Sequence, residues 1–441
     1  MVITAILVLV SILLIILLTS VVKLNAFVSL FIVSLLLALT TVPFTNVVTI
    51  LKDGFGSTMA SIGFLIIFGA IIAVVLDKSG GAISIATAIL HKTGTKNAAA
   101  AMGITGFITG MPIFCDSGFI ILSGLAKSVS AKTKIAMPFI AIVLATSLYS
   151  VHCLVPTHPG ALAAAGLLKV DIGTLILVGT LFAFPSAITA FYWTKWRTNS
   201  GQITQKEDLP DVESIEEQKL PSVFLSLLPI VVPLLLISLN SLLTAFGYKN
   251  QNGLIIALLF IGQPVIALFT GMLLSLLLIG FKKMETINEI FESAVVKAGP
   301  ILIVTAAGGM FGMVIKETGV GAYAGEVLVK TGLGLAVPFL FAFLLKTAQG
   351  SSTVAIITAS SFIAPMLPAL GLDSETGKIM TMVVMGAGSM MISHANDSYF
   401  WVITRFSNIQ TDTTLKIYSS ATIVMGITVF VCALVVSRMV L

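Results

Sequence analysis

The chain is dominated by long apolar runs that are separated by short polar or glycine-rich breaks. Runs long enough to cross a bilayer, which takes roughly 20 residues, lie near residues 2–20, 26–50, 58–76, 135–156, 173–194, 222–245, 253–281, 295–315, 378–395 and 417–440. They are continuous rather than alternating, so they predict spanning helices and not the strands of a membrane barrel. The pattern therefore predicts an all-α polytopic membrane protein.

Two regions between these runs contain only half-length apolar arms around a polar tip. The first tip is Gly110–Gly118, and its arms of about 15 residues each are too short to span a bilayer. The proline and glycines of this tip disfavour a continuous helix. We therefore expect re-entrant hairpins at about 97–131 and 335–368, each with its tip inside the membrane.

The two halves of the chain resemble each other at one constant offset. Asp77–Gly80 aligns with Lys316–Gly319, 239 residues later, and the same offset brings Pro156–His158 onto Ala395–Asp397. The first tip falls close to Gln349–Thr353. This order predicts an internal duplication of the transporter kind, with a hairpin and a broken spanning helix in each copy.

A hydrophilic segment, 195–221, divides the chain into two transmembrane halves, 1–194 and 222–441. It holds ten of the 43 charged residues and no apolar run, so we expect a cytoplasmic connector. Lysines flank the first hairpin on both sides, whereas the flanks of the second are weakly charged. The positive-inside rule then places the hairpins on opposite faces and predicts that the two repeats are inverted.

Composition agrees with this class and excludes several others. Of the 441 residues, 57% are hydrophobic and only 10% are charged, which no soluble domain of this size would show. A net charge of +5 is ordinary for basic cytoplasmic loops, so nucleic-acid binding is not indicated. The three cysteines lack metal-type spacing, so no metal site is expected. The sequence has no P-loop lysine motif and no hydrolase motif, so neither ATP-driven transport nor a membrane-embedded enzyme is indicated.

Two acidic residues, Asp116 and Asp397, lie inside apolar segments rather than in loops or near segment ends. An ionisable group at membrane depth is costly unless it is paired or faces a water-filled cavity, so both are candidates for proton coupling. The alternative for Asp116 is a structural acid bonded to helix ends. The alternative for Asp397 is a plain helix cap.

The segment Ser150–Gly160 forms a further break, because it contains two prolines and a glycine. Half-helix N-termini at such a break favour a carboxylate, and histidine can take up a proton near neutral pH. We therefore expect His152 and His158 to bind substrate, and His158 to share in proton coupling. The alternative for both is a buried neutral histidine bonded to a freed carbonyl.

The second tip combines a cation with hydroxyl and amide groups. Lys346 precedes a cluster that suits a polyhydroxylated anion, with the lysine for charge and the hydroxyls for hydrogen bonds. The alternative is close packing of the hairpin arms by small residues. The stretch Gly386–Met391 also looks nucleotide-like, but it has no strand–loop–helix setting, so we assign it to close helix packing.

Several stretches of the chain resemble the gluconate permease (GntP-type) family. They occur in the family's order over nearly the whole chain and are Gly56–Ala82, Pro-x-Phe-x-Asp-x-Gly (112–118), His-x-x-Val-Pro-Thr-His-Pro-Gly (152–160) and Gln-Gly-Ser-Ser-Thr-Val-Ala (349–355). The chain departs from the usual pattern at Asp116, Thr157 and Lys346, where members often have Glu, Pro and Arg. These departures favour a different or smaller substrate than gluconate itself.

The resemblance implies an ion-transporter-superfamily fold in the bacterial inner membrane and proton symport of gluconate, a related sugar acid or hydroxy acid, or D-serine. The proton is the expected coupling ion, no other cofactor is expected, and sodium is the less favoured alternative. The implied partners are a small organic anion and the lipid bilayer, and related folds often form homodimers. With the residues above, the expected substrate-binding set is Cys115, Ser117, His152, Thr157, His158, Lys346, Gln349, Ser351, Ser352, Thr353 and Asn396, and the expected proton-coupling set is Asp116, Asp397 and His158.

The competing hypothesis within transport is a sodium-coupled or exchange carrier of a dicarboxylate such as citrate. It predicts a sodium requirement and more than one basic group near the site. A membrane-embedded enzyme or a channel would instead need a catalytic motif or a continuous polar stripe along several helices, and the sequence shows neither.

Overall fold

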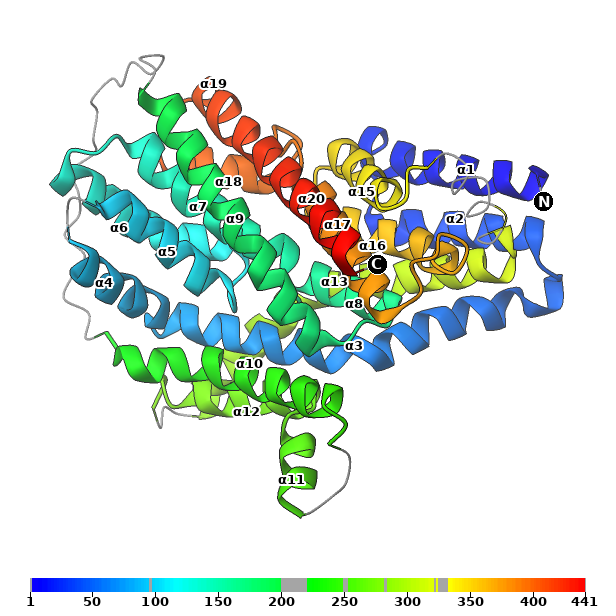
Figure 1. The fold of residues 1–441 in the computed structure, drawn as a ribbon, viewed down its shortest axis with the longest axis horizontal. Coiled ribbons are helices and arrows are strands. Elements are labelled where there is room, and N and C mark those ends of the chain that lie inside the picture. Colours follow the sequence, from blue (N-terminus) through cyan, green and yellow to red (C-terminus); the bar gives the residue numbers. More distant parts are fainter. Residues whose placement is uncertain are drawn as a thin grey trace.

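A computed structural model describes residues 2–94, 97–199, 220–248, 253–280, 284–320, 323 and 332–440. Most of the expected connector, 195–221, lies outside these residues. In the part that is described, every regular element is helical (Figure 1). Seven described helices are long and apolar enough to cross a membrane, or eight when one bent pair counts as a span. The predicted polytopic all-α class is confirmed.

The helices of the first half range from ten to 32 residues in length. They are α1 (Val2–Ile16), α2 (Ala26–Thr41), α3 (Val47–Lys78), α4 (Gly81–Thr93), α5 (Ala98–Gly110), α6 (Cys115–Thr133), α7 (Met137–Leu154), α8 (Pro159–Leu168) and α9 (Ile172–Asn199).

The second half repeats this alternation of long and short helices. Its helices are α10 (Val223–Ala245), α11 (Gly253–Ile261), α12 (Pro264–Leu276), α13 (Met284–Glu317), α15 (Ala336–Gln349), α16 (Ser352–Ile363), α17 (Glu375–Met390), α18 (Ser398–Phe406), α19 (Thr411–Thr414) and α20 (Ser420–Val440).

The helix boundaries recur at the offset seen in the sequence. Helix α3 ends at Lys78 and α13 ends at Glu317, 239 residues later. By the same offset, the start of α8 corresponds to the start of α18, and the start of α9 to the start of α19. Equivalent helices also make equivalent contacts, because α5 packs on α7 as α15 packs on α17.

Two predicted spans are wrong in their boundaries. The run 26–50 is divided, because α2 ends at Thr41 and Pro43 lacks the N–H that would continue the helix. The second part of that run joins the next one to make the single long helix α3. The run 253–281 is bent by 71° between α11 and α12, where Pro264 holds Gln263 in an extended conformation.

The short helices of one half pack on the other half. Helix α6 contacts α18, and α16 contacts α8, so each pair of short arms is covered partly by the opposite repeat. Helices α9 and α20 run side by side across the middle of the molecule (Figure 1). Where α3 and α13 pack together, Gly54 lies against Met310 and Asp77 lies near Lys297, so these two equivalent helices are antiparallel.

The close packing expected of Gly386–Met391 is confirmed. A Cβ built on Gly386 would lie 2.7 Å from the Cys153 carbonyl oxygen of α7. A Cβ on Gly388 would lie 2.3 Å from the Phe339 carbonyl oxygen and 2.9 Å from the Phe343 nitrogen of α15. Helix α17 can therefore lie between α7 and α15 only with glycine at these positions.

Substitution of Gly388 by alanine should destabilise the protein, because its methyl group would meet backbone atoms that cannot move alone. We expect the free energy of unfolding to fall by about 1–3 kcal/mol, measured by thermal unfolding in detergent. Gly56 is the matched control, since a Cβ there meets nothing within 4 Å. Gly56→Ala should leave stability unchanged or slightly raised, and equal losses in both variants would contradict the packing role of Gly388.

Candidate functional site

A cavity of about 270 Å³ lies where the short helices of the two halves meet. Its wall is formed by the first turns of four described helices, together with α7 and α13. The lining residues are Phe114, Cys115, Asp116, Ser117, Tyr149, His152, Pro159, Lys297, Ile301, Ser351, Ser352, Thr353, Asp397, Ser398 and Tyr399.

The four helices α6, α8, α16 and α18 all begin at this cavity because the chain is interrupted just before each of them. A helix start leaves N–H groups without intrahelical partners and carries a partial positive charge. Ser351 and Asp397 cap α16 and α18 by accepting bonds from Val354 N and Tyr399 N. The N-cap residues of α6 and α8 make no side-chain bond to their helices, and α8 begins at Pro159, which has no N–H. The arrangement favours an anion.

The carbonyl groups freed at the breaks are bonded by side chains. His158 Nε2 lies 2.5 Å from the Gly110 carbonyl, which requires the ring proton on Nε2. In the second half, Asn396 Nδ2 donates to the Thr347 carbonyl at 2.8 Å. Lys346 Nζ donates to the Gly350 carbonyl. Each tip is therefore bonded to the break of its own half.

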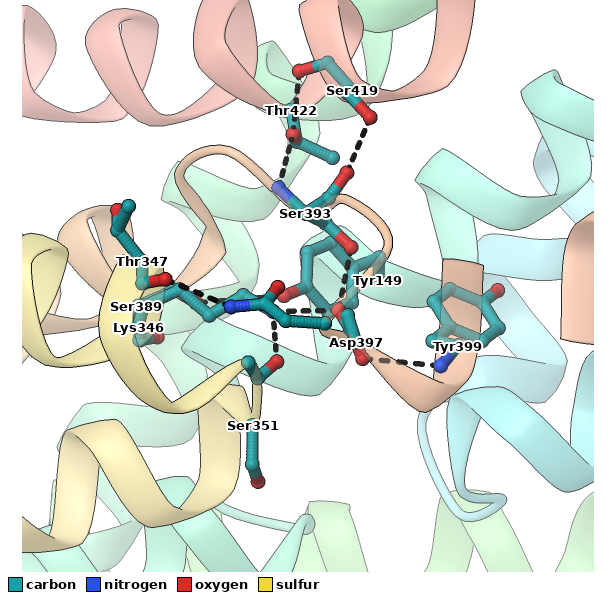
Figure 2. Close-up of polar contacts among 12 residues, drawn as sticks. Tyr149, Lys346, Thr347, Ser351, Ser389, Ser393, Asp397, Tyr399, Ser419 and Thr422 are labelled. Carbon is teal, nitrogen blue, oxygen red and sulfur yellow. Dashed lines mark hydrogen bonds and ion pairs between the residues drawn. The ribbon is translucent and has the colours of Figure 1, made fainter. Parts of the chain in front are cut away.

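Asp397, which lines the cavity, forms an ion pair with Lys346, which does not. Lys346 Nζ lies 2.6 Å from Asp397 Oδ2, and the two side chains are 0% and 7% exposed. Figure 2 shows the lysine of α15 directed at the carboxylate that precedes α18, and Ser393 donating to the same oxygen at 2.5 Å. Tyr149 places its ring 5.9 Å from the ammonium. Because both charges are paired and hydrogen-bonded, the pair can exist in a buried setting.

The segment that carries Ser393 is fixed in turn to α20 and to the short π-helix before it. Ser393 N donates to Thr422 Oγ1 at 3.1 Å, and Ser419 Oγ donates to the Ser393 carbonyl at 2.5 Å (Figure 2). The position of Asp397 thus depends on the last spanning helix as well as on the second tip.

Asp116 has a different environment. It lies in the first turn of α6 and lines the cavity. Its Oδ1 atom is buried and has no hydrogen-bond partner, and among the described residues no cation lies within salt-bridge distance of it. A buried carboxylate oxygen without a partner is costly, so a proton, a ligand or water is needed there.

His152 lies between the two tips. Its Nε2 atom is 3.4 Å from Thr353 Oγ1 of α16, and its ring packs against His158 with 4.8 Å between centroids. The Nδ1 atom is buried without a partner. This nitrogen is therefore a second polar group at the cavity whose bonding capacity is unused.

The structure brings together many of the residues expected from the sequence, although their roles stay predictions. Cavity-lining positions are occupied by Cys115, Asp116, Ser117, His152, Ser351, Ser352, Thr353 and Asp397. The remaining expected residues do not line it and are Thr157, His158, Lys346, Gln349 and Asn396. Among these, the Thr157 hydroxyl and both amide atoms of Gln349 are buried without partners.

Sequence reasoning missed Tyr149, Tyr399 and Lys297, which also line the cavity. Tyr149 lies three residues before His152 on α7, so its place on the same helix face could have been found from helical spacing. Tyr399 lies two residues after Asp397, in the first turn of α18. Lys297 is inside the apolar run 295–315, where a cation at membrane depth is itself a signal.

Comparison with known proteins finds permeases among the relatives of this chain. Residues 3–440 match the family model described as GntP family permease. The gluconate permease of Zymomonas mobilis is 31% identical over 93% of this chain and 92% of its own length. The inner membrane permease YgbN of Escherichia coli is 30% identical over 92% of both chains.

The fold also has a counterpart among solved structures. The chain is similar to Neisseria gonorrhoeae MtrF, which is described as illuminating a class of antimetabolite efflux pumps, with a TM-score of 0.65 over 88% of this chain and 85% of that one. The sequence identity is 15%, so the similarity concerns the fold alone.

Replacing Lys346 by methionine should destabilise the protein strongly, because Asp397 is left buried without its counter-ion. We expect the free energy of unfolding to fall by about 3–5 kcal/mol. Thermal unfolding in detergent measures this loss. The double variant Lys346→Met, Asp397→Asn should recover part of this loss, since asparagine can still cap Tyr399 N.

The control for this variant is Lys378→Met, whose partner Glu375 is 4.0 Å away and 52% exposed. This substitution should change the free energy of unfolding by less than about 1 kcal/mol. A double variant that is less stable than Lys346→Met would show that the pair is not the cause of the loss.

Proposed function

The chain belongs to the GntP family of permeases and is a transporter rather than an enzyme, and we propose that it takes up gluconate or a related small hydroxylated carboxylate together with a proton. It is a multi-pass protein of the inner membrane. The observation that carries the proposal is the unpaired Asp116 in an anion-favouring cavity.

The charges around the cavity support proton coupling. Asp397 is compensated by Lys346, whereas Asp116 has no cation within salt-bridge distance among the described residues. An anionic substrate that enters beside an ionised Asp116 would meet an uncompensated like charge in a poorly screened site. Protonation of Asp116 removes this repulsion, so the proton and the anion bind together. Release of one then favours release of the other.

The polar lining supports a hydroxylated anion. The starts of α6 and α8 lie at the cavity and provide partial positive charge there. The hydroxyls of Ser117, Ser352 and Thr353 can donate to, or accept from, substrate hydroxyls. A volume of about 270 Å³ suits a small organic acid rather than a large one.

Two inverted repeats with re-entrant hairpins are the architecture that we infer for transport. The equivalent helices α3 and α13 pack antiparallel, as they would if a two-fold axis in the membrane plane related the halves. The pairs α5–α6 and α15–α16 are then hairpins that enter from opposite faces. Opening the two tips in turn would expose the cavity alternately to each side.

Substitution of Asp116 by asparagine should abolish uptake driven by a pH gradient. The variant cannot carry the proton, but it presents a neutral group to the anion, so substrate exchange at equal pH should persist. Proteoliposomes with an imposed pH gradient, inside alkaline, measure the first property, and counterflow of labelled gluconate measures the second.

The matched control is Asp412→Asn, since Asp412 is 70% exposed and pairs only with Lys416. It should transport like the unsubstituted protein. If uptake driven by the pH gradient persists in Asp116→Asn, Asp116 does not carry the coupled proton. If uptake requires sodium, the sodium-coupled alternative is favoured.

Substrates should stabilise the purified protein against heat. A ligand at about 100 times its Kd raises the free energy of unfolding by about 2.7 kcal/mol, so a thermal-shift panel can rank candidates. We expect sugar acids to stabilise and the uncharged polyols of equal length to have no effect. Stabilisation by citrate but by no sugar acid would contradict the proposed substrate class.

A further inference from the structure

Lys297 is a cation that the proposed function leaves without a role. It belongs to α13, lines the cavity one helical turn before Ile301, and is 38% exposed. Among the described lysine and arginine residues it is the one that lines this cavity. Lys346, by contrast, is fully buried and is bonded to Asp397 and to the Gly350 carbonyl.

The partner of Lys297 holds it weakly. Lys297 Nζ lies 3.6 Å from Asp77 Oδ2, and the aspartate is 30% exposed. Asp77 lies in the last turn of α3, where the negative end of the helix dipole disfavours a carboxylate. Partly exposed pairs of this length contribute little to stability. Exchange of Asp77 for another carboxylate would therefore cost little.

We propose that Lys297 binds the carboxylate of the substrate and that Asp77 is the resting counter-ion which the substrate displaces. This inference rests on the proposed function, since it specifies how the same cavity recognises its anion. The substrate carboxylate takes the place of the aspartate beside the ammonium. The hydroxyls of the substrate then bond to the polar tips.

One lysine at the cavity also defines the substrate class. A single ammonium matches a single carboxylate, and the other lining groups are hydroxyls, backbone donors and neutral rings. A second carboxylate would lack a cation and would meet Asp116 or the already neutralised Asp397. The geometry thus favours a monocarboxylate with a hydroxylated chain over a dicarboxylate.

Opposite effects of two substitutions test the proposal. Lys297→Ala should raise the KM for gluconate about ten- to hundred-fold, the range for loss of a charged hydrogen bond. Asp77→Asn should lower the KM by up to about fivefold, because the competing carboxylate is removed. Both values come from initial uptake rates of the full chain in proteoliposomes, and Lys297→Arg should recover most of the affinity.

Lys316→Ala is the matched control, because Lys316 is an exposed residue at the other end of α13. It should leave the KM unchanged. If Lys297 and Asp77 merely hold α13 to α3, both substitutions will change the KM in the same direction, and that result overturns the proposal. An unchanged KM in Lys297→Ala overturns it as well.

The proposed function and the role of the Lys297–Asp77 pair can fail separately. If the unsubstituted protein shows no uptake of any sugar acid under a pH gradient, the proposed function fails. If it shows such uptake and Asp77→Asn does not lower the KM, only the role of the Lys297–Asp77 pair fails.

Discussion

The need to satisfy backbone polar groups inside an apolar protein governs this structure. Among the described residues, four helices begin at breaks beside the cavity, and each break frees carbonyl and N–H groups that apolar surroundings cannot bond. The carbonyl ends are bonded by side chains, since His158 bonds Gly110, Asn396 bonds Thr347 and Lys346 bonds Gly350. The four helix starts lie at one cavity, and two of them are capped by Ser351 and Asp397. The breaks therefore form the site. They are stabilised because side chains donate hydrogen bonds to their carbonyl groups.

This division of the backbone groups explains why so few charged side chains suffice at the site. Helix starts provide a positive potential without a formal charge, and they need no desolvation of an ammonium. The charged side chains can then have other roles. Lys346 and Asp397 join the second tip to its break, whereas Asp116 lines the cavity with one carboxylate oxygen unbonded.

The sequence predicted the positions of the breaks better than the contacts between them. Prolines and glycines are local signals, so the arms near Gly110 and Gly350 agree with the helix ends that the structure shows. The pairing of Lys346 with Asp397 joins residues 51 positions apart, and periodicity carries no information at that separation. Lys297 stands near the start of the apolar run 295–315, and its place at the cavity follows from the packing of α13, which the run does not show. Pro43 indicates a helix end within the run 26–50, but the length of that apolar run led to the prediction of a single span.

Helix boundaries recur at the offset of 239, but the chemistry at the corresponding positions differs. At the offset of 239, Asp116 corresponds to Ala355, Lys346 to Phe107 and Asp397 to His158. The first tip is thus held to its break by a neutral hydrogen bond, and the second by a buried ion pair. Separating the second tip from Asp397 would leave two charges uncompensated, which is far more costly than losing one neutral bond. If the tips open in turn, the two openings differ in energy, and the state with the second tip closed is the one that the charges favour.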